Sequence, residues 1–193
     1  LRRAYRRAKN LGETSVEILT PTVDVVDGLV ERAIKVEANS WKAGAGTALS
    51  SRPERAAFFK AFARHAAADG TLRISFLTID GADAAMQIAV SFQSAWWVYK
   101  IGYDEEFATC SPGIILMSET ISAAADAGLE RFEFMGKSDP WIRMWTRETH
   151  DLVTIRTYPH TLQGLAAVTA DVCARFSTRL RSALLPTRPS TAP

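Results

Sequence analysis

The first candidate for a functional site is a short turn, Ser111-Pro112-Gly113. It follows a predicted strand and begins a predicted helix. Ser111 is a residue type that caps helix N-termini, and Pro112 removes a backbone donor where a helix needs none. Gly113 lets a ligand approach the backbone. The free N–H groups and positive dipole end of a helix start suit a phosphate. The turn is therefore a candidate anion site, and plain helix capping is the alternative interpretation.

Side chains that can move protons lie at the end of the preceding run and beyond it. Tyr99 and Tyr103 belong to the run, Asp104 follows it directly, and Asp139 and His150 come later. A tyrosine can act as a general acid and a carboxylate or imidazole as a general base. Each has a simpler interpretation as well, because Asp104 and Asp139 can cap turns and His150 can be an ordinary surface residue. These residues are candidates for acid–base chemistry.

Composition excludes several other classes of protein. The two cysteines, Cys110 and Cys173, stand without a CxxC pair or histidine at ligand spacing, so we expect no metal site. A formal net charge of +2 does not favour DNA as a partner. The apolar runs are too short to span a membrane. Two isolated cysteines fit a reducing compartment, and we expect a cytoplasmic location.

The elements that must position these residues follow from hydrophobic periodicity. Helical spacing predicts an amphipathic helix in residues 1–11 and others in residues 23–40, 51–69, 113–127 and 162–185. A short helix or turn is predicted over 139–145. The segment 186–193 has the composition of a disordered tail. Residues 1–185 are expected to form a single domain.

Strands are predicted in residues 16–19, 71–80, 84–92, 94–103, 131–135 and 152–158. Short connections make three of them an antiparallel meander that ends with residues 94–103. The helix over 113–127 then leads to the strand over 131–135, a strand–helix–strand crossover that predicts a parallel pair. The fold class is therefore α/β with a mixed sheet. Ligands in open sheets bind where strands splay at their carboxyl ends, which here is the end of the run at Tyr103.

A family resemblance rests on several motifs along residues 12–158. They are Trp41-Lys42, Gly70-Thr71-Leu72-Arg73, Asp80-Gly81, Tyr99-Lys100-Ile101-Gly102-Tyr103-Asp104, Ser111-Pro112-Gly113 with Leu116, Ala127-Gly128-Leu129, and Phe132 to Gly136. This pattern resembles the GNAT-like acyltransferases associated with cellulose and exopolysaccharide biosynthesis (the CelD-type group), which are related in fold to the FemAB peptidyltransferases. The resemblance implies the GNAT fold. It also implies a second, similar lobe in the full protein, or a homodimer.

The resemblance implies an acyl-CoA donor, usually acetyl-CoA, lying against the splayed strand. Val98 and Lys100 of that strand would contact the donor, and its pyrophosphate would rest on the turn formed by Ser111, Pro112, Gly113, Ile114, Ile115 and Leu116. An amine would then attack the thioester directly. Tyr99 or Tyr103 would protonate the leaving thiolate, and Asp104 or Asp139 would serve as the base. Most GNAT enzymes have more glycine at this turn than the single Gly113 found here.

The expected acceptor is an amine of a sugar, peptide or small metabolite. Trp141, Arg143 and Lys137 are the candidate acceptor-binding residues. The sequence departs from the family here, because related proteins carry a lysine where this chain has Ile142. Two alternatives stay open. One is a catalytically silent module in polysaccharide assembly, and the other is FemAB-like aminoacyl transfer from tRNA, for which the basic segment 1–9 is the hint.

Overall fold

The computed structural model describes residues 1–40, 53–136, 139–151, 153 and 155–184 of the 193-residue chain. The chain divides into two compact units, Leu1–Thr146 and Arg147–Pro193. Within the described ranges, none of the helices combines the length and hydropathy that crossing a membrane requires. The expectation of one domain over residues 1–185 stays a prediction, and the tail 186–193 lies outside the described residues.

A five-stranded sheet, in the order β1-β2-β3-β4-β5, forms the centre of the first unit. The strands are β1 (Thr14–Leu19), β2 (Leu72–Ile79), β3 (Ala82–Phe92), β4 (Ala95–Tyr103) and β5 (Arg131–Glu133). Neighbours from β1 to β4 are antiparallel, whereas β4 and β5 are parallel. The predicted meander and strand–helix–strand crossover are therefore confirmed, and the sheet is mixed.

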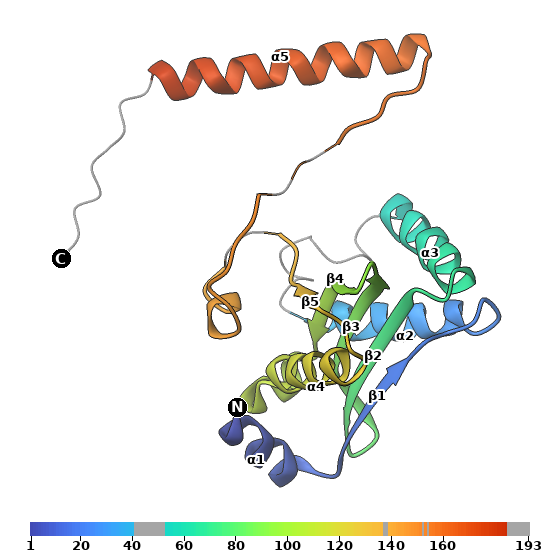
Figure 1. Ribbon diagram of the computed structural model, residues 1–193, viewed down its shortest axis with the longest axis vertical. Coiled ribbons are helices and arrows are strands. Elements are labelled where there is room, and N and C mark those ends of the chain that lie inside the picture. Colours follow the sequence, from blue (N-terminus) through green and yellow to red (C-terminus); the bar gives the residue numbers. More distant parts are fainter. Residues whose placement is uncertain (41–52, 137–138, 152, 154, 185–193) are drawn as a thin grey trace. The chain divides into compact units, whose positions relative to one another are not determined.

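Helices cover both faces of this sheet (Figure 1). On one face, α2 (Val26–Ala38) and α3 (Pro53–Ala68) pack on Ile74 and Phe76 of β2. On the other, α1 (Arg2–Leu11) and α4 (Pro112–Asp126) pack on Leu77 and Ile79. Alternate side chains of a strand point to opposite faces, so β2 supplies apolar residues to both cores and is buried along its length.

The connections follow the turn signals in the sequence. Asp80 and Gly81 both have left-handed backbone angles, with φ of 49° and 76°, in the tight turn between β2 and β3. Gly128, with φ of 72°, ends α4. The 3₁₀ helix η2 (Glu105–Cys110) links β4 to α4, and a second one, η3 (Ile142–Met144), falls inside the predicted 139–145 segment. The motif Trp41-Lys42 and the first two residues of the helix predicted over 51–69 lie outside the described residues.

The second unit contains the predicted C-terminal helix, α5 (Leu162–Leu184). The strand predicted over 152–158 is wrong, because its described residues, 153 and 155–158, form no strand. Arg156 and Tyr158 instead bind the Asp171 carboxylate of α5. Val153 and Ile155, the apolar residues that suggested a buried strand face, are 85% and 83% exposed. Alternating residues make a strand only where a neighbouring strand pairs with them.

Candidate functional site

Strand β4 has an open edge. Its pairing with β5 covers only Ala95–Trp97, which face Arg131–Glu133. From Val98 to Tyr103, no described strand borders β4 on that side, although β3 continues to pair with it on the other. The parallel pairing therefore covers only the first three of the nine residues of β4. The backbone N–H and C=O groups along such an edge can bind an extended ligand in place of a strand.

A β-bulge lies within this open stretch. Ile88 of β3 pairs with Lys100, whereas its neighbour Ala89 pairs with Val98, so Tyr99 is the extra residue. The bulge turns Tyr99 and Lys100 toward the same face, because a bulge interrupts the alternation of side chains. The Tyr99 ring lies 5.1 Å from that of Phe62 in α3.

Lys100 forms a buried ion pair on this same face. Its ammonium lies 2.7 Å from the carboxylate of Glu37, near the end of α2, and the Glu37 side chain is only 1% exposed. The Lys100 side chain is 22% exposed, so it lies between the carboxylate and the surface. A buried carboxylate needs a charged partner because desolvation would otherwise be too costly. The sequence reasoning missed Glu37, although an acidic residue at a core position of an amphipathic helix was a usable signal.

The predicted base Asp104 is held by two hydrogen bonds. One carboxylate oxygen accepts from the backbone N–H of Glu106, 2.9 Å away, and the other from the amide of Asn39, 2.7 Å away. The backbone N–H of Glu105 also donates to the Asn39 carbonyl, at 3.3 Å. Asp104 thus starts η2 and ties the end of β4 to the end of α2, which matches its simpler interpretation as a capping residue.

Tyr103 lies on the opposite face of β4 from Tyr99, beside the start of α4. A Cβ atom placed on Gly113 would be 3.7 Å from the Tyr103 ring. Burial, and secondarily the negative charge of Glu105, raises the pKa of the Tyr103 hydroxyl. The phenol is therefore protonated at neutral pH and can donate a proton.

The start of α4 differs from the predicted cap in one respect. Ser111 is the N-cap residue, as predicted, but it has a left-handed backbone, with φ of 55°, and its side chain makes no capping hydrogen bond. This strained conformation sends the chain from η2 into the helix at Pro112. The first turn contains no acidic or basic side chain. Any attraction for an anion within this turn comes from backbone N–H groups and the helix dipole.

The residues of that turn are held by the core. Pro112, Ile115 and Leu116 are buried, whereas Gly113 and Ile114 are half-buried. The backbone N–H of Ile114 donates to the Ser111 carbonyl at 3.0 Å. A rigid helix start of this kind is suitable for a phosphate group, because the amide directions are fixed before binding.

The candidate acceptor residues lie after β5. A chain of aromatic rings runs from Trp96 through Phe132 and Phe134 to Trp141, with centroid separations of 6.2, 5.2 and 6.0 Å. Arg143 in η3 is exposed, as is Asp139. Lys137 lies outside the described residues. His150 belongs to the second unit. The structure thus joins Trp141 to β4 through aromatic contacts.

A buried polar network lies between α4 and the face of the sheet that this helix covers. The indole N–H of Trp96 donates to the Gln87 amide oxygen at 2.9 Å, and the Gln87 amide nitrogen donates to the Thr120 hydroxyl at 3.1 Å. These bonds tie the paired end of β4 to α4. No group of histidine, cysteine or acidic side chains suited to holding a metal ion occurs in the described residues.

Comparison with known proteins identifies a family for most of the chain. A family model described as an acetyltransferase (GNAT) domain matches residues 1–143. No curated protein matches the sequence significantly. Solved structures of acetyltransferases share the fold, at low sequence identity.

Three of these structures are informative. A GCN5-related N-acetyltransferase from Ralstonia eutropha JMP134 has a TM-score of 0.53 and 14% identity, over 75% of this chain and 99% of that one. An aminoglycoside acetyltransferase from an uncultured soil metagenomic sample has a TM-score of 0.52 and 10% identity, over 77% and 99%. AAC(6')-Iy, solved with a bisubstrate analog of CoA and acetylneamine, has a TM-score of 0.51 and 11% identity, over 76% and 99%.

Proposed function

Because the chain belongs to the family of acetyltransferase (GNAT) domains, we propose that it transfers an acetyl or other acyl group from acyl-CoA to an amine. The observation that carries this proposal is the open edge of β4 from Val98 to Tyr103, next to the start of α4. The use of CoA is further supported by AAC(6')-Iy, whose structure holds a CoA bisubstrate analog.

The donor would lie along the open edge. Its pantetheine arm contains amide groups that can bond to the backbone of β4, including Val98 and the bulged stretch at Lys100. Its pyrophosphate would rest on the amides of the turn from Ser111 to Leu116. The thioester would then lie near the bulge, where Tyr99 has no partner residue in β3 and a strand N–H would polarise the carbonyl.

The reaction would be direct attack of the amine on the thioester carbon. A C–N bond forms as the carbonyl electron pair moves to oxygen, and the oxyanion then expels the thiolate while the amine loses a proton. Tyr103 is the preferred donor of a proton to the thiolate, because it lies on the α4 face, beside the turn proposed to hold the pyrophosphate. Asp104 and Asp139 remain the candidate bases, with Asp104 needing to release one of its two hydrogen bonds.

The acceptor would approach the opposite face of β4. The Tyr99–Phe62 pair offers an aromatic surface there, and Tyr99 is 46% exposed. Aromatic faces bind sugar rings and attract ammonium groups. The aminoglycoside acetyltransferase and the acetylneamine analog suggest amino sugars as the first acceptors to test. Trp141, Arg143 and Lys137 would contact the remainder of the acceptor, and an exopolysaccharide setting of the CelD type remains part of the proposal.

A silent module is the second candidate, and the sequence after β5 favours it. Ile142 stands where the CelD-type pattern that the sequence resembles has a lysine, and its neighbour Arg143 is exposed in η3. Binding of acetyl-CoA without turnover on any amine would support this second function. Thiol release with an amino sugar would support the first.

The decisive experiment is acetyl-CoA binding to the whole chain, measured by calorimetry, for the wild type and for Gly113→Asp. A side chain fits at Gly113, because the nearest atom to its Cβ would be 3.7 Å away. The helix dipole stabilises a carboxylate at this position, but the carboxylate repels phosphate. We therefore expect acetyl-CoA binding to weaken at least about 10-fold without loss of protein stability. The control is Gly28→Asp in α2, where nothing lies within 4 Å. Unchanged binding by Gly113→Asp would rule out this site.

A further inference from the structure

Helix α1 is firmly attached beside the proposed donor site. Ala8 is 1% exposed and packs with Cys110 and Ile115, at the end of η2 and in the first turns of α4. The Tyr5 hydroxyl binds the carboxylate of Glu119 in α4. The exposed face of α1 is therefore held in a fixed position relative to the start of α4.

That exposed face is strongly basic. It consists of five exposed cations, which are Arg2, Arg3, Arg6, Arg7 and Lys9. None of them takes part in an ion pair among the described residues. A dense cluster of like charges without acidic partners is electrostatically unfavourable, and an anionic ligand would relieve it.

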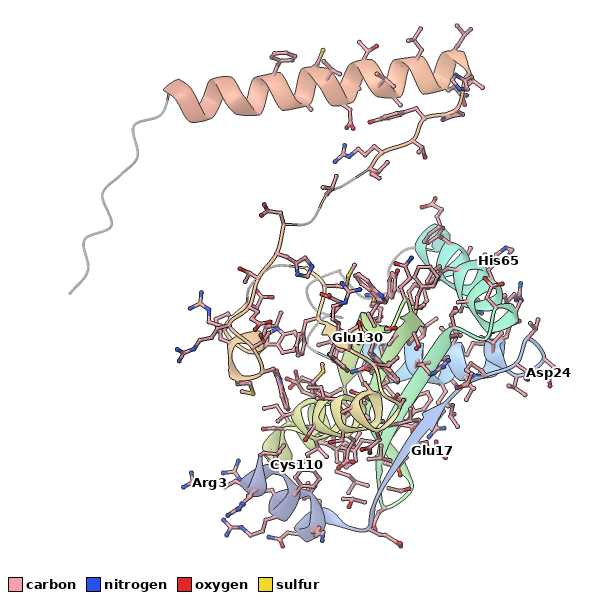
Figure 2. The ribbon with its side chains drawn as sticks, in the orientation of Figure 1. Arg3, Glu17, Asp24, His65, Cys110 and Glu130 are labelled. Carbon is pink, nitrogen blue, oxygen red and sulfur yellow. The ribbon has the colours of Figure 1, made fainter. Side chains whose placement is uncertain are left out.

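One flank of the basic face borders η2. The Arg7 guanidinium donates a hydrogen bond to the backbone carbonyl of Thr109, at 3.1 Å. Thr109 precedes Ser111 by two residues in the sequence. Arg3 lies four residues earlier and therefore shares this flank. Figure 2 shows the Arg3 side chain pointing away from the core of the unit. By contrast, helical spacing puts Arg2 and Lys9 on the other flank.

We propose that Arg3 and Arg7 bind the 3′-phosphate of the CoA donor, an inference that rests on the proposed function. The first turn of α4 has no charged side chain, so it can hold the pyrophosphate only through its backbone. The 3′-phosphate is a monoester with a charge of about −2 at neutral pH. Arginine is the side chain best suited to it, because the guanidinium can donate two parallel hydrogen bonds. Helix α1 thus adds a second phosphate site beside the first.

The experiment compares CoA with 3′-dephospho-CoA, which keeps the pyrophosphate but lacks the 3′-phosphate. Calorimetry is performed with the whole chain at low and moderate salt. We expect the wild type to bind CoA about 10-fold more tightly, a preference that shrinks as salt rises. The double variant Arg3→Gln/Arg7→Gln should lose the preference while binding dephospho-CoA as the wild type does. That unchanged affinity also shows that the variant is folded.

The matched control is Arg2→Gln/Lys9→Gln, which removes the same charge from the other flank. It should keep most of the preference for CoA. Equal loss in both double variants would mean that only the general charge of α1 matters, and would overturn the assignment to Arg3 and Arg7. So would a wild type that binds the two ligands equally. If the wild type binds neither ligand, the proposed function itself fails.

Discussion

The ammonium of Lys100 lies 2.7 Å from the carboxylate of Glu37, which is almost wholly buried. Because the bulge at Tyr99 turns Lys100 toward α2, this pair fixes the end of that helix to the middle of β4. Gly102, two residues further along β4, also lies close to the α2 backbone. A Cβ atom placed on it would be 3.3 Å from the Glu37 Cα. This face of β4 is thus joined to α2 by charge and by close backbone packing.

Removal of Lys100 should be costly for stability. In Lys100→Met the Glu37 carboxylate stays buried without its cation, so we expect unfolding in urea to show a loss of about 2–4 kcal/mol. The control is Lys60→Met, which breaks the exposed pair with Glu31 and should cost less than about 1 kcal/mol. Adding Glu37→Leu to Lys100→Met should restore part of the loss. A Lys100→Met protein as stable as the control variant would contradict a buried pair.

The glycine at position 102 should not tolerate a side chain. In Gly102→Ala the new methyl group would be 3.2 Å from the Met86 side chain and 3.3 Å from the α2 backbone. Both contacts are tighter than normal, so Met86 and α2 must each move away slightly. We expect a loss of roughly 1–3 kcal/mol in denaturant unfolding. Gly28→Ala, inside α2 with open space around it, should instead gain about 0.5–1 kcal/mol. The free energy of unfolding should therefore fall in Gly102→Ala and rise in Gly28→Ala. An unchanged stability of Gly102→Ala would argue against the close packing.

The two tyrosines of β4 should have separable roles. Tyr103→Phe removes the proposed proton donor, so we expect kcat with acetyl-CoA and an amino sugar to fall about 10- to 100-fold with little change in KM. Tyr99→Ala removes the aromatic ring that packs against Phe62, and it should mainly raise KM for the acceptor. If Tyr99→Phe lowers kcat and Tyr103→Phe does not, the assignment of the two residues is reversed.

The raised pKa of Tyr103 also predicts a pH dependence. A phenol whose pKa is higher in the folded state is favoured in its neutral form. Its contribution to stability is therefore complete below pH of about 10, the ordinary tyrosine value, and is lost as the pH rises through the folded pKa. We expect Tyr103→Phe to be less sensitive to alkaline unfolding than the wild type, as measured by circular dichroism above pH 9. Equal sensitivity would show that Tyr103 is not desolvated.

The two cysteines should differ in reactivity. Burial raises the pKa of the Cys110 thiol, whose sulfur also lies 3.1 Å from the Phe107 carbonyl. Cys173 is exposed. Because the thiolate is the reactive form, Ellman's reagent at neutral pH should label one cysteine rapidly in the native protein and both in urea. Native Cys173→Ala should show almost no rapid labelling, and fast labelling of that variant would mean that Cys110 is accessible.

The sequence predicted the architecture because each element carried its own local signal. Apolar alternation marked the meander, and the switch to helical spacing after Pro112 marked the crossover. The bulge at Tyr99 had no such signal, since it depends on which residue of β3 pairs with Lys100. In a regular strand, a spacing of four residues would put Tyr99 and Tyr103 on one face, whereas the bulge puts them on opposite faces.

Two other features were out of reach of local reasoning. A serine before Pro112 is a typical cap, but the backbone of Ser111 is set by η2, which brings the chain in from another direction. The apolar residues Val153 and Ile155 alternate as in a strand, yet hydrogen bonding to a neighbour decides whether a strand forms. The candidate residues at the site were chosen by type. Their partners Asn39 and Phe62 are known only from tertiary contacts, whereas Glu37 had a local signal as an acidic residue at a core position of α2.

The early end of the pairing between β4 and β5 has one more consequence. A sheet that stops pairing at Trp97 leaves the amide protons of Val98 to Tyr103 poorly shielded on one side. A donor that bonds to this edge would act as a substitute strand, and the ligand would complete the sheet that the chain leaves unfinished. Hydrogen–deuterium exchange in this segment would then slow when the donor binds, so the open edge of β4 would report on occupancy.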